Sequence, residues 1–147
     1  MKVIMRPGKQ ITWCVLVLAL GMSADAVLAD VVVVVSSNSP VVELNKNQLA
    51  DIFLGKVRRF PDGREVVPID QEEGMAARDE FYAKFIGKSA TQIKAHWSKI
   101  IFASRGRPPK AALSGDEVKN LLAENPNAIG YIERSEVDSR VKVLLPK

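Results

Sequence analysis

The sequence contains one cysteine, Cys14, and one histidine, His96. A single thiol cannot form a disulfide within its own chain, so the protein is not a disulfide-stabilised scaffold. The chain also lacks the H-E-x-x-H, G-x-S-x-G and P-loop patterns, and it has no cysteine ligand set for a metal. We interpret His96 as a structural or surface residue, because it lies beside Trp97 in a helical pattern. We therefore expect no enzyme activity, no metal and no cofactor.

The first 29 residues differ in character from the rest of the chain. Lys2, Arg6 and Lys9 precede an apolar run from Ile11 to Met22, and the small residue Ala29 follows that run. This order is typical of a secretory signal peptide that is cleaved after Ala29. An uncleaved anchor is the alternative, but an apolar run of about 12 residues is shorter than the roughly 20 that span a bilayer.

Cleavage after residue 29 would leave a single domain over residues 30–147, which fits the size of one ordinary domain. It removes three basic residues and one acidic residue, Asp25, and leaves 18 basic and 16 acidic residues. The remaining net charge of +2 is too small to indicate a nucleic-acid partner. We predict a periplasmic protein with no stable membrane anchor after cleavage.

Hydrophobic patterns in this domain predict alternating strands and helices. Strands are expected where β-branched or apolar runs lie between turn residues, over 30–35, 66–69, 128–132 and 141–145. Helices are expected between capping and stop residues, over about 45–55, 74–86, 89–101 and 114–125. Capping boxes are expected at Asn45, Ser89 and Ser114, and Gly87 is expected to end the second helix. The basic segment from Ser104 to Lys110 is expected to be a loop, because it contains Gly106 and two prolines.

This order predicts the α/β class, with a three-layer-like mixed sheet of about four strands flanked by helices. The five consecutive valines of Val31–Val35 fit a strand that is buried on both faces. Apolar residues from three helical faces and one strand should share a single core. That core is expected to contain Phe53, Phe81, Phe85, Trp97 and Ile129.

Four stretches carry a family resemblance in the same order along the chain. They are Leu49–Lys56 (LADIFLGK), Asp62-Gly63, Val67–Ile69 and Asn125–Ile132 (NPNAIGYI). Together they resemble the substrate-binding proteins of phosphate ABC transporters, which have the type 2 periplasmic binding protein fold. The resemblance implies one lobe of that two-lobed fold, a PBP-like domain in a short single-lobe form.

The resemblance also implies where a ligand would bind. In the family, the loop after the second strand carries an arginine and a Gly-Ser-Gly-Thr that opens a helix, and phosphate sits on the free N–H groups there. Here Asp70 stands in place of the arginine, and Glu73 to Ala76 replace the glycine and hydroxyl set. Phosphate binding is therefore expected to be weak or absent. The resemblance implies a ligand at the start of the helix over 74–86. The candidate ligand-binding residues there are Asp70, Gly74, Met75 and Ala76, and Ser36, Ser37 and Asn38 are expected to lie opposite them.

Two functions fit this sequence. The first is a periplasmic solute-binding-like protein that takes a small anion, with the family's phosphate loop degraded. The second is an interaction or sensory-partner module in the cell envelope, which docks on a membrane transporter or sensor. Arg105, Arg107 and Lys110 form an alternative anion or partner surface, because the surrounding glycine and prolines fix their loop.

Overall fold

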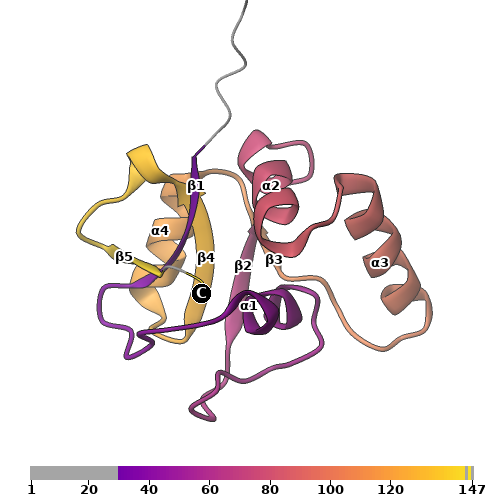
Figure 1. The fold of residues 1–147 in the computed structure, drawn as a ribbon, viewed down its shortest axis with the longest axis horizontal. Helices are drawn as coiled ribbons and strands as arrows, with labels where there is room; N and C mark the ends of the chain where they lie inside the picture. Colours follow the sequence, from indigo (N-terminus) through magenta and orange to yellow (C-terminus); the bar gives the residue numbers. More distant parts are fainter. Residues whose placement is uncertain (1–29, 145, 147) are drawn as a thin grey trace, which may run out of the picture.

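The computed structural model describes residues 30–144 and 146, which form a mixed five-stranded sheet flanked by helices (Figure 1). Across the sheet, the strands follow the order β3 (Lys110–Ala112), β2 (Val67–Gln71), β4 (Ala128–Glu133), β1 (Val31–Ser36) and β5 (Val141–Leu144). The predicted α/β class is confirmed. The predicted signal peptide over residues 1–29 lies outside the described residues.

The sheet has one strand more than the sequence predicted. The short strand β3 begins at Lys110, the last residue of the segment that was predicted to be a loop. It pairs in parallel with β2, with Lys110 opposite Ile69 and Ala112 opposite Gln71. Three residues that follow two prolines carry no strand pattern of their own, so the hydrogen bonds of β2 create this edge strand.

The strand directions define two ends of the sheet. Strand β1 runs antiparallel to β4, with Val35 opposite Ile129. Strand β2 runs parallel to β4, with Pro68 also opposite Ile129. The end of β1 therefore lies level with the start of β2, at what we call the Ser36 end. The last residues of β2 lie at the opposite end, which we call the Gln71 end.

The helices are α1 (Lys46–Phe53), α2 (Ala76–Phe81), α3 (Ala90–Phe102) and α4 (Gly115–Glu124), with a π-helical turn at Tyr82–Ile86 and a 3-10 turn at Arg134–Glu136. The capping boxes predicted at Asn45 and Ser89 are confirmed. Ser114 caps α4, but Glu117 accepts a hydrogen bond from the N–H of Leu113 instead of completing a box. No helix in the described part of the chain is long and apolar enough to cross a bilayer.

The helix predicted over residues 74–86 is shorter and less regular than expected. Its α-helical part, α2, has only six residues before the backbone widens into the π-helical turn at Tyr82. Gly87 ends the turn in the left-handed conformation, with a φ of 71°, as its role of stop residue predicted.

The sheet separates two hydrophobic clusters. Val31, Val33 and Val35 join residues of α1, α2 and α3 on one face, and Val32 and Val34 join residues of α4 on the other. Both faces of the valine strand are therefore buried, as predicted. The predicted core residues lie together in the first cluster, with Phe53, Phe81, Trp97 and Ile129 buried and Phe85 partly buried against them.

Gly130 of β4 allows α4 to approach the sheet closely. A Cβ atom at this position would lie 2.8 Å from Cγ1 of Val118 on α4. Real Cβ atoms do not approach carbon atoms so closely, so any other residue here would require a shift of Val118 or of its surroundings.

Candidate functional site

Asp70, which stands where the family's phosphate loop has its arginine, is buried and forms hydrogen bonds with neighbouring side chains. Its Oδ2 accepts a hydrogen bond of 2.7 Å from the Tyr82 hydroxyl, and its Oδ1 accepts one from the Tyr131 hydroxyl. The backbone N–H of Gln71 also donates to Oδ1, at 2.8 Å. Only 4% of the surface of Asp70 is exposed. The carboxylate therefore points into the protein and not toward a ligand.

Arg78 supplies the positive charge that balances this buried carboxylate. Its Nε lies 3.5 Å from Oδ1 of Asp70, and its guanidinium carbon lies 5.2 Å from the centre of the Tyr82 ring. Burial raises the pKa of the Tyr82 and Tyr131 hydroxyls, and the charge of Asp70 raises it further. Both hydroxyls thus stay protonated as donors. We call Asp70, Arg78, Tyr82 and Tyr131 the Asp70 network.

The Asp70 network corrects part of the argument made from the sequence. There, Asp70 was a candidate ligand-binding residue, and its negative charge, in place of the family's arginine, was expected to weaken phosphate binding. Arg78 offsets this charge from α2, eight residues further along the chain. Glu73 has a partner too, because its Oε1 lies 3.2 Å from Nζ of Lys94. The spacing of these residues in the sequence did not indicate these pairs. The chain has two tyrosines, Tyr82 and Tyr131, and both belong to the Asp70 network.

The start of α2 is an open surface feature. Gly74 is exposed and left-handed, with a φ of 92°, and no atom lies within 4 Å of the position a Cβ would take. Met75 precedes the helix without a side-chain capping bond, and Ala76 is exposed. These three residues lie together, as their sequence positions require. They offer backbone groups but no hydroxyl or guanidinium group.

Ser36, Ser37 and Asn38 do not lie opposite this loop, contrary to the predicted site. Ser36 ends β1 at the Ser36 end of the sheet, and Ser37 and Asn38 follow it there, whereas Gly74 follows β2 at the Gln71 end. Ser36 is buried, and its Oγ accepts a hydrogen bond of 3.2 Å from the N–H of Asn38. The antiparallel direction of β1, which the sequence pattern did not reveal, separates the two groups by the length of the strands.

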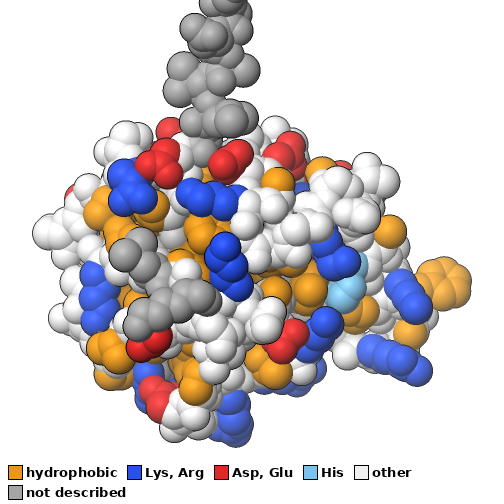
Figure 2. All heavy atoms as spheres, viewed as in Figure 1, with side chains coloured by type: hydrophobic (Ala, Val, Ile, Leu, Met, Phe, Trp, Pro, Cys, Tyr) orange, Lys and Arg blue, Asp and Glu red, His pale blue; other side chains and the backbone are white. Residues whose placement is uncertain are grey.

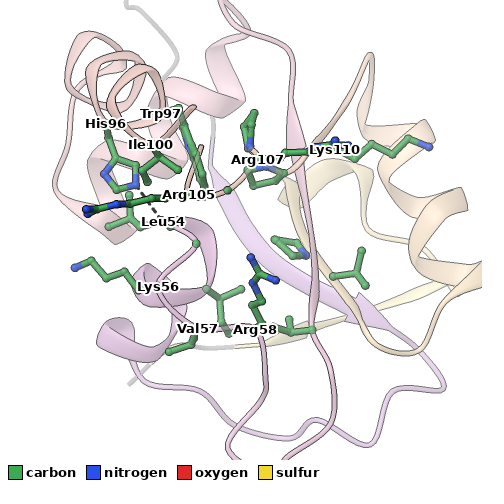
Figure 3. A pocket seen from close by; sticks show the side chains of 18 of the residues that line it. Leu54, Lys56, Val57, Arg58, His96, Trp97, Ile100, Arg105, Arg107 and Lys110 are labelled. Atoms are coloured by element: carbon green, nitrogen blue, oxygen red, sulfur yellow. Dashed lines mark hydrogen bonds between the residues drawn. The ribbon is translucent and has the colours of Figure 1, made fainter. Parts of the chain in front are cut away.

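The alternative surface predicted at Arg105, Arg107 and Lys110 forms part of a hollow at the Ser36 end. This hollow has a volume of about 740 Å³. Its walls come from the end of α1 and the segment after it, the start of β2, one side of α3 and the loop before β3. Figure 3 shows Arg105 beside His96 on the α3 side, and Arg58 on the side of the segment that follows α1.

Five basic side chains and no acidic side chain line this hollow. The basic residues are Lys56, Arg58, Arg105, Arg107 and Lys110. Lys56 has a carboxylate partner, Asp51, at 3.7 Å. The others form no side-chain hydrogen bond or ion pair within residues 30–144 and 146. We call this the basic hollow. Sequence reasoning found the loop residues, and missed Lys56 and Arg58 as members of the same site.

The basic hollow also has an apolar floor and a fixed frame. Trp97 and Ile100 of α3 line it together with Val57, Pro108 and Pro109. His96 contacts the carbonyl oxygen of Leu54 through Nε2 at 2.9 Å and so ties α3 to the end of α1 (Figure 3). No group of three or more potential metal ligands occurs in the part of the chain that the structure describes.

Neither a protein-family model nor a curated protein matches this chain. Several solved structures share its fold. A putative phosphate ABC transporter substrate-binding protein with bound phosphate, from Clostridium perfringens, is 24% identical, with a TM-score of 0.58 over 79% of this chain and 44% of its own. An ABC-type phosphate transport receptor from Vibrio cholerae is 22% identical, with a TM-score of 0.61 over 80% and 47%. PstS from Borrelia burgdorferi is 12% identical, with a TM-score of 0.61 over 81% and 47%.

The chain therefore spans less than half the length of each of these proteins. The five-stranded sheet and its helices correspond to a lobe of their two-lobed fold, which is the architecture that the sequence resemblance implied. At these identities, the likeness shows that the chain has the fold of one lobe of the phosphate-transporter substrate-binding proteins.

Proposed function

We propose that the chain is an exported, periplasmic binding protein that takes an anion without using the family's phosphate loop. The Asp70 network is the observation that carries this proposal. In the family that the chain resembles, an arginine at this position contacts the phosphate. Here the position holds the buried carboxylate of Asp70, which accepts hydrogen bonds from Tyr82 and Tyr131. An anion at the start of α2 would find backbone N–H groups alone, beside the exposed acids Glu72 and Glu73.

The exposure of the start of α2 supports the same conclusion. A small-ligand site normally encloses most of the ligand surface. Gly74 and Ala76 are exposed, so an ion held at the start of α2 would stay in contact with water. An exposed ion pair or hydrogen bond is weak, because water screens it and competes for the same groups.

Calorimetry with inorganic phosphate tests the proposal. The wild-type protein is expected to give no heat of binding in the micromolar range. The matched control is a loop graft, Glu73→Gly, Gly74→Ser, Met75→Gly and Ala76→Thr, which leaves Asp70 in place because Arg at that position would face Arg78 in the interior. Measurable phosphate binding by the graft shows that the assay is sensitive. Micromolar phosphate binding by the wild type that survives changes at Arg105 and Arg107 would contradict the proposal.

A second candidate function is docking on a membrane transporter or sensor, and exposed apolar residues favour it. Phe102 is 96% exposed and Ile101 is 53% exposed at the end of α3. Figure 2 shows hydrophobic atoms protruding on this side of the molecule between Lys and Arg side chains. A photo-crosslinking residue at position 102 separates the two functions in cells. Adducts with one membrane protein would favour docking, and their absence would favour solute binding alone.

A further inference from the structure

We infer that the basic hollow is a binding site for a small organic dianion with an apolar body, such as a phosphate monoester or a dicarboxylate. This inference rests on the proposed anion-binding function and names its site and ligand class. The site lies at the Ser36 end of the sheet. The start of α2, where the family resemblance placed the ligand, lies at the Gln71 end.

Charge is the first argument. Elsewhere on the described surface, many basic side chains have a carboxylate within 4 Å. Examples are Arg64 with Asp62 at 2.7 Å, Arg134 with Asp30 at 2.6 Å and Lys94 with Glu73 at 3.2 Å. The basic hollow instead gathers five cations with no acid among its lining residues, and of the five only Lys56 has a carboxylate, that of Asp51, within 4 Å. Like charges that share a concave surface repel one another, and a bound anion with two charges relieves that repulsion.

The types of basic side chain in the hollow indicate which acidic groups the ligand carries. Three of the five are arginines, whose planar guanidinium groups can donate two parallel hydrogen bonds to a carboxylate or a phosphate. Arg58 comes from the segment after α1, whereas Arg105 and Arg107 come from the loop before β3. Cations on two sides of the hollow suit a ligand that carries two negative charges.

The apolar floor indicates the rest of the ligand. Trp97, Ile100 and the two prolines present carbon surface between the basic side chains. Inorganic phosphate or sulfate would cover little of this surface and would fill little of the 740 Å³. A ring or a short hydrocarbon chain attached to the acidic group of the ligand would bury this apolar floor. Burial of apolar surface stabilises the complex. The volume lies within the range of small-molecule sites, which is about 300–1,000 Å³.

The frame of the hollow is held in place before any ligand binds. Gly55 turns the chain after α1 with a φ of 72°, and a Cβ there would lie 2.7 Å from the Trp97 ring. The loop that carries Arg105 is tied to α3 by a bond from the Arg105 N–H to the Ile100 carbonyl at 3.0 Å, and Lys110 pairs with β2 at its other end. A preformed frame lowers the entropy cost of binding.

Phenyl phosphate is the first probe, and isophthalate is the second. In a Trp13→Phe background, Trp97 is the only tryptophan, so its emission on excitation at 295 nm reports on the floor of the hollow. We expect both probes to bind by calorimetry and phenyl phosphate to change the Trp97 emission with the same Kd. Benzyl alcohol, which lacks the charge, and inorganic phosphate, which lacks the apolar body, are expected to bind at least about 10-fold more weakly.

Two exposed side chains without partners supply the test variants. Arg105→Gln and Arg107→Gln are each expected to weaken phenyl phosphate binding by about 10-fold, since each removes one charge-assisted contact. The thermal midpoint should not fall, because both side chains are exposed and have no partner among the described residues, and the loss of one positive charge reduces the repulsion in the hollow. The matched control is Arg134→Gln, which removes one positive charge at the Gln71 end. It should leave the affinity unchanged.

The outcomes separate this inference from the proposed function. Dianion binding that is insensitive to both arginine changes, or absent altogether, overturns the basic hollow as a small-ligand site. An acidic peptide that binds where neither small dianion does overturns it too, in favour of a protein partner. The proposed function fails separately, when the wild type binds inorganic phosphate at micromolar concentration and the changes at Arg105 and Arg107 leave that binding intact.

Discussion

Raising the pH above 10 should destabilise this protein through its two tyrosines. Tyr82 and Tyr131 both donate to Asp70, and burial followed by the Asp70 charge raises the pKa of each hydroxyl above the ordinary value of 10.0. In the unfolded chain both hydroxyls ionise near pH 10. The folded state then binds two more protons than the unfolded state. The contribution of the two tyrosines to the free energy of unfolding is therefore fully present below pH 10 and is lost as the pH rises above 10.

The slope of this loss follows from the number of protons. Each proton of difference changes the free energy of unfolding by about 1.4 kcal/mol per pH unit, so the pair contributes a fall of about 2.7 kcal/mol per unit. A domain with a total stability of about 5–15 kcal/mol would lose a large fraction of it between pH 10 and 12.

Absorbance at 295 nm measures tyrosinate directly, and Tyr82 and Tyr131 are the only tyrosines. We expect no tyrosinate signal in the folded protein at pH 10–11, followed by one step that coincides with the loss of circular dichroism. In urea, both tyrosines should ionise near pH 10, and Tyr82→Phe should halve that amplitude. Tyrosinate that forms with a midpoint near pH 10 while the circular dichroism stays native would refute the Asp70 network.

Three further predictions concern the core, the helix contact and export. Trp97→Ala should lower the free energy of unfolding by about 3–5 kcal/mol, and an unchanged urea transition would show that its face is not buried. Gly130→Ala should lower the free energy of unfolding by about 1–3 kcal/mol through its clash with Val118. Adding Val118→Ala should restore much of this loss, and purely additive effects of the two changes would count against the contact. Intact mass of the periplasmic protein should give Asp30 as the first residue, and a species that retains Trp13 would refute cleavage.

Patterns within short stretches of sequence predicted many of the helices and strands, because interactions between residues close in the chain determine these elements. The capping boxes at Asn45 and Ser89 depend on residues three apart, and both formed. The valine strand is buried on both faces because its composition allows no solvated face. The core residues followed from helical spacing. The order of strands and helices was therefore accessible without knowledge of how the strands pair.

The elements that the sequence did not reveal depend on pairing between distant segments. Strand β3 exists because β2 offers it a hydrogen-bonding edge. Ser36 and Gly74 lie at opposite ends because β1 runs antiparallel to β4 while β2 runs parallel to it. The partnership of Asp70 with Tyr131 joins residues 61 apart in the chain. None of these relations leaves a periodic trace within a window of ten or twenty residues.

The same limit applies to charge. The net charge of +2 for residues 30–147 was too small to indicate a nucleic-acid partner, but a total does not show how the charges are distributed. Five positive charges without an acid line one hollow, so the rest of this region carries a net charge of −3. On that remaining surface many basic residues are paired with carboxylates, whereas the hollow retains a repulsion that costs stability in the free protein. Local arrangements that oppose folding in this way occur at functional sites. The cluster of positive charges in the basic hollow therefore favours anion binding, and the small overall charge of the region does not argue against it.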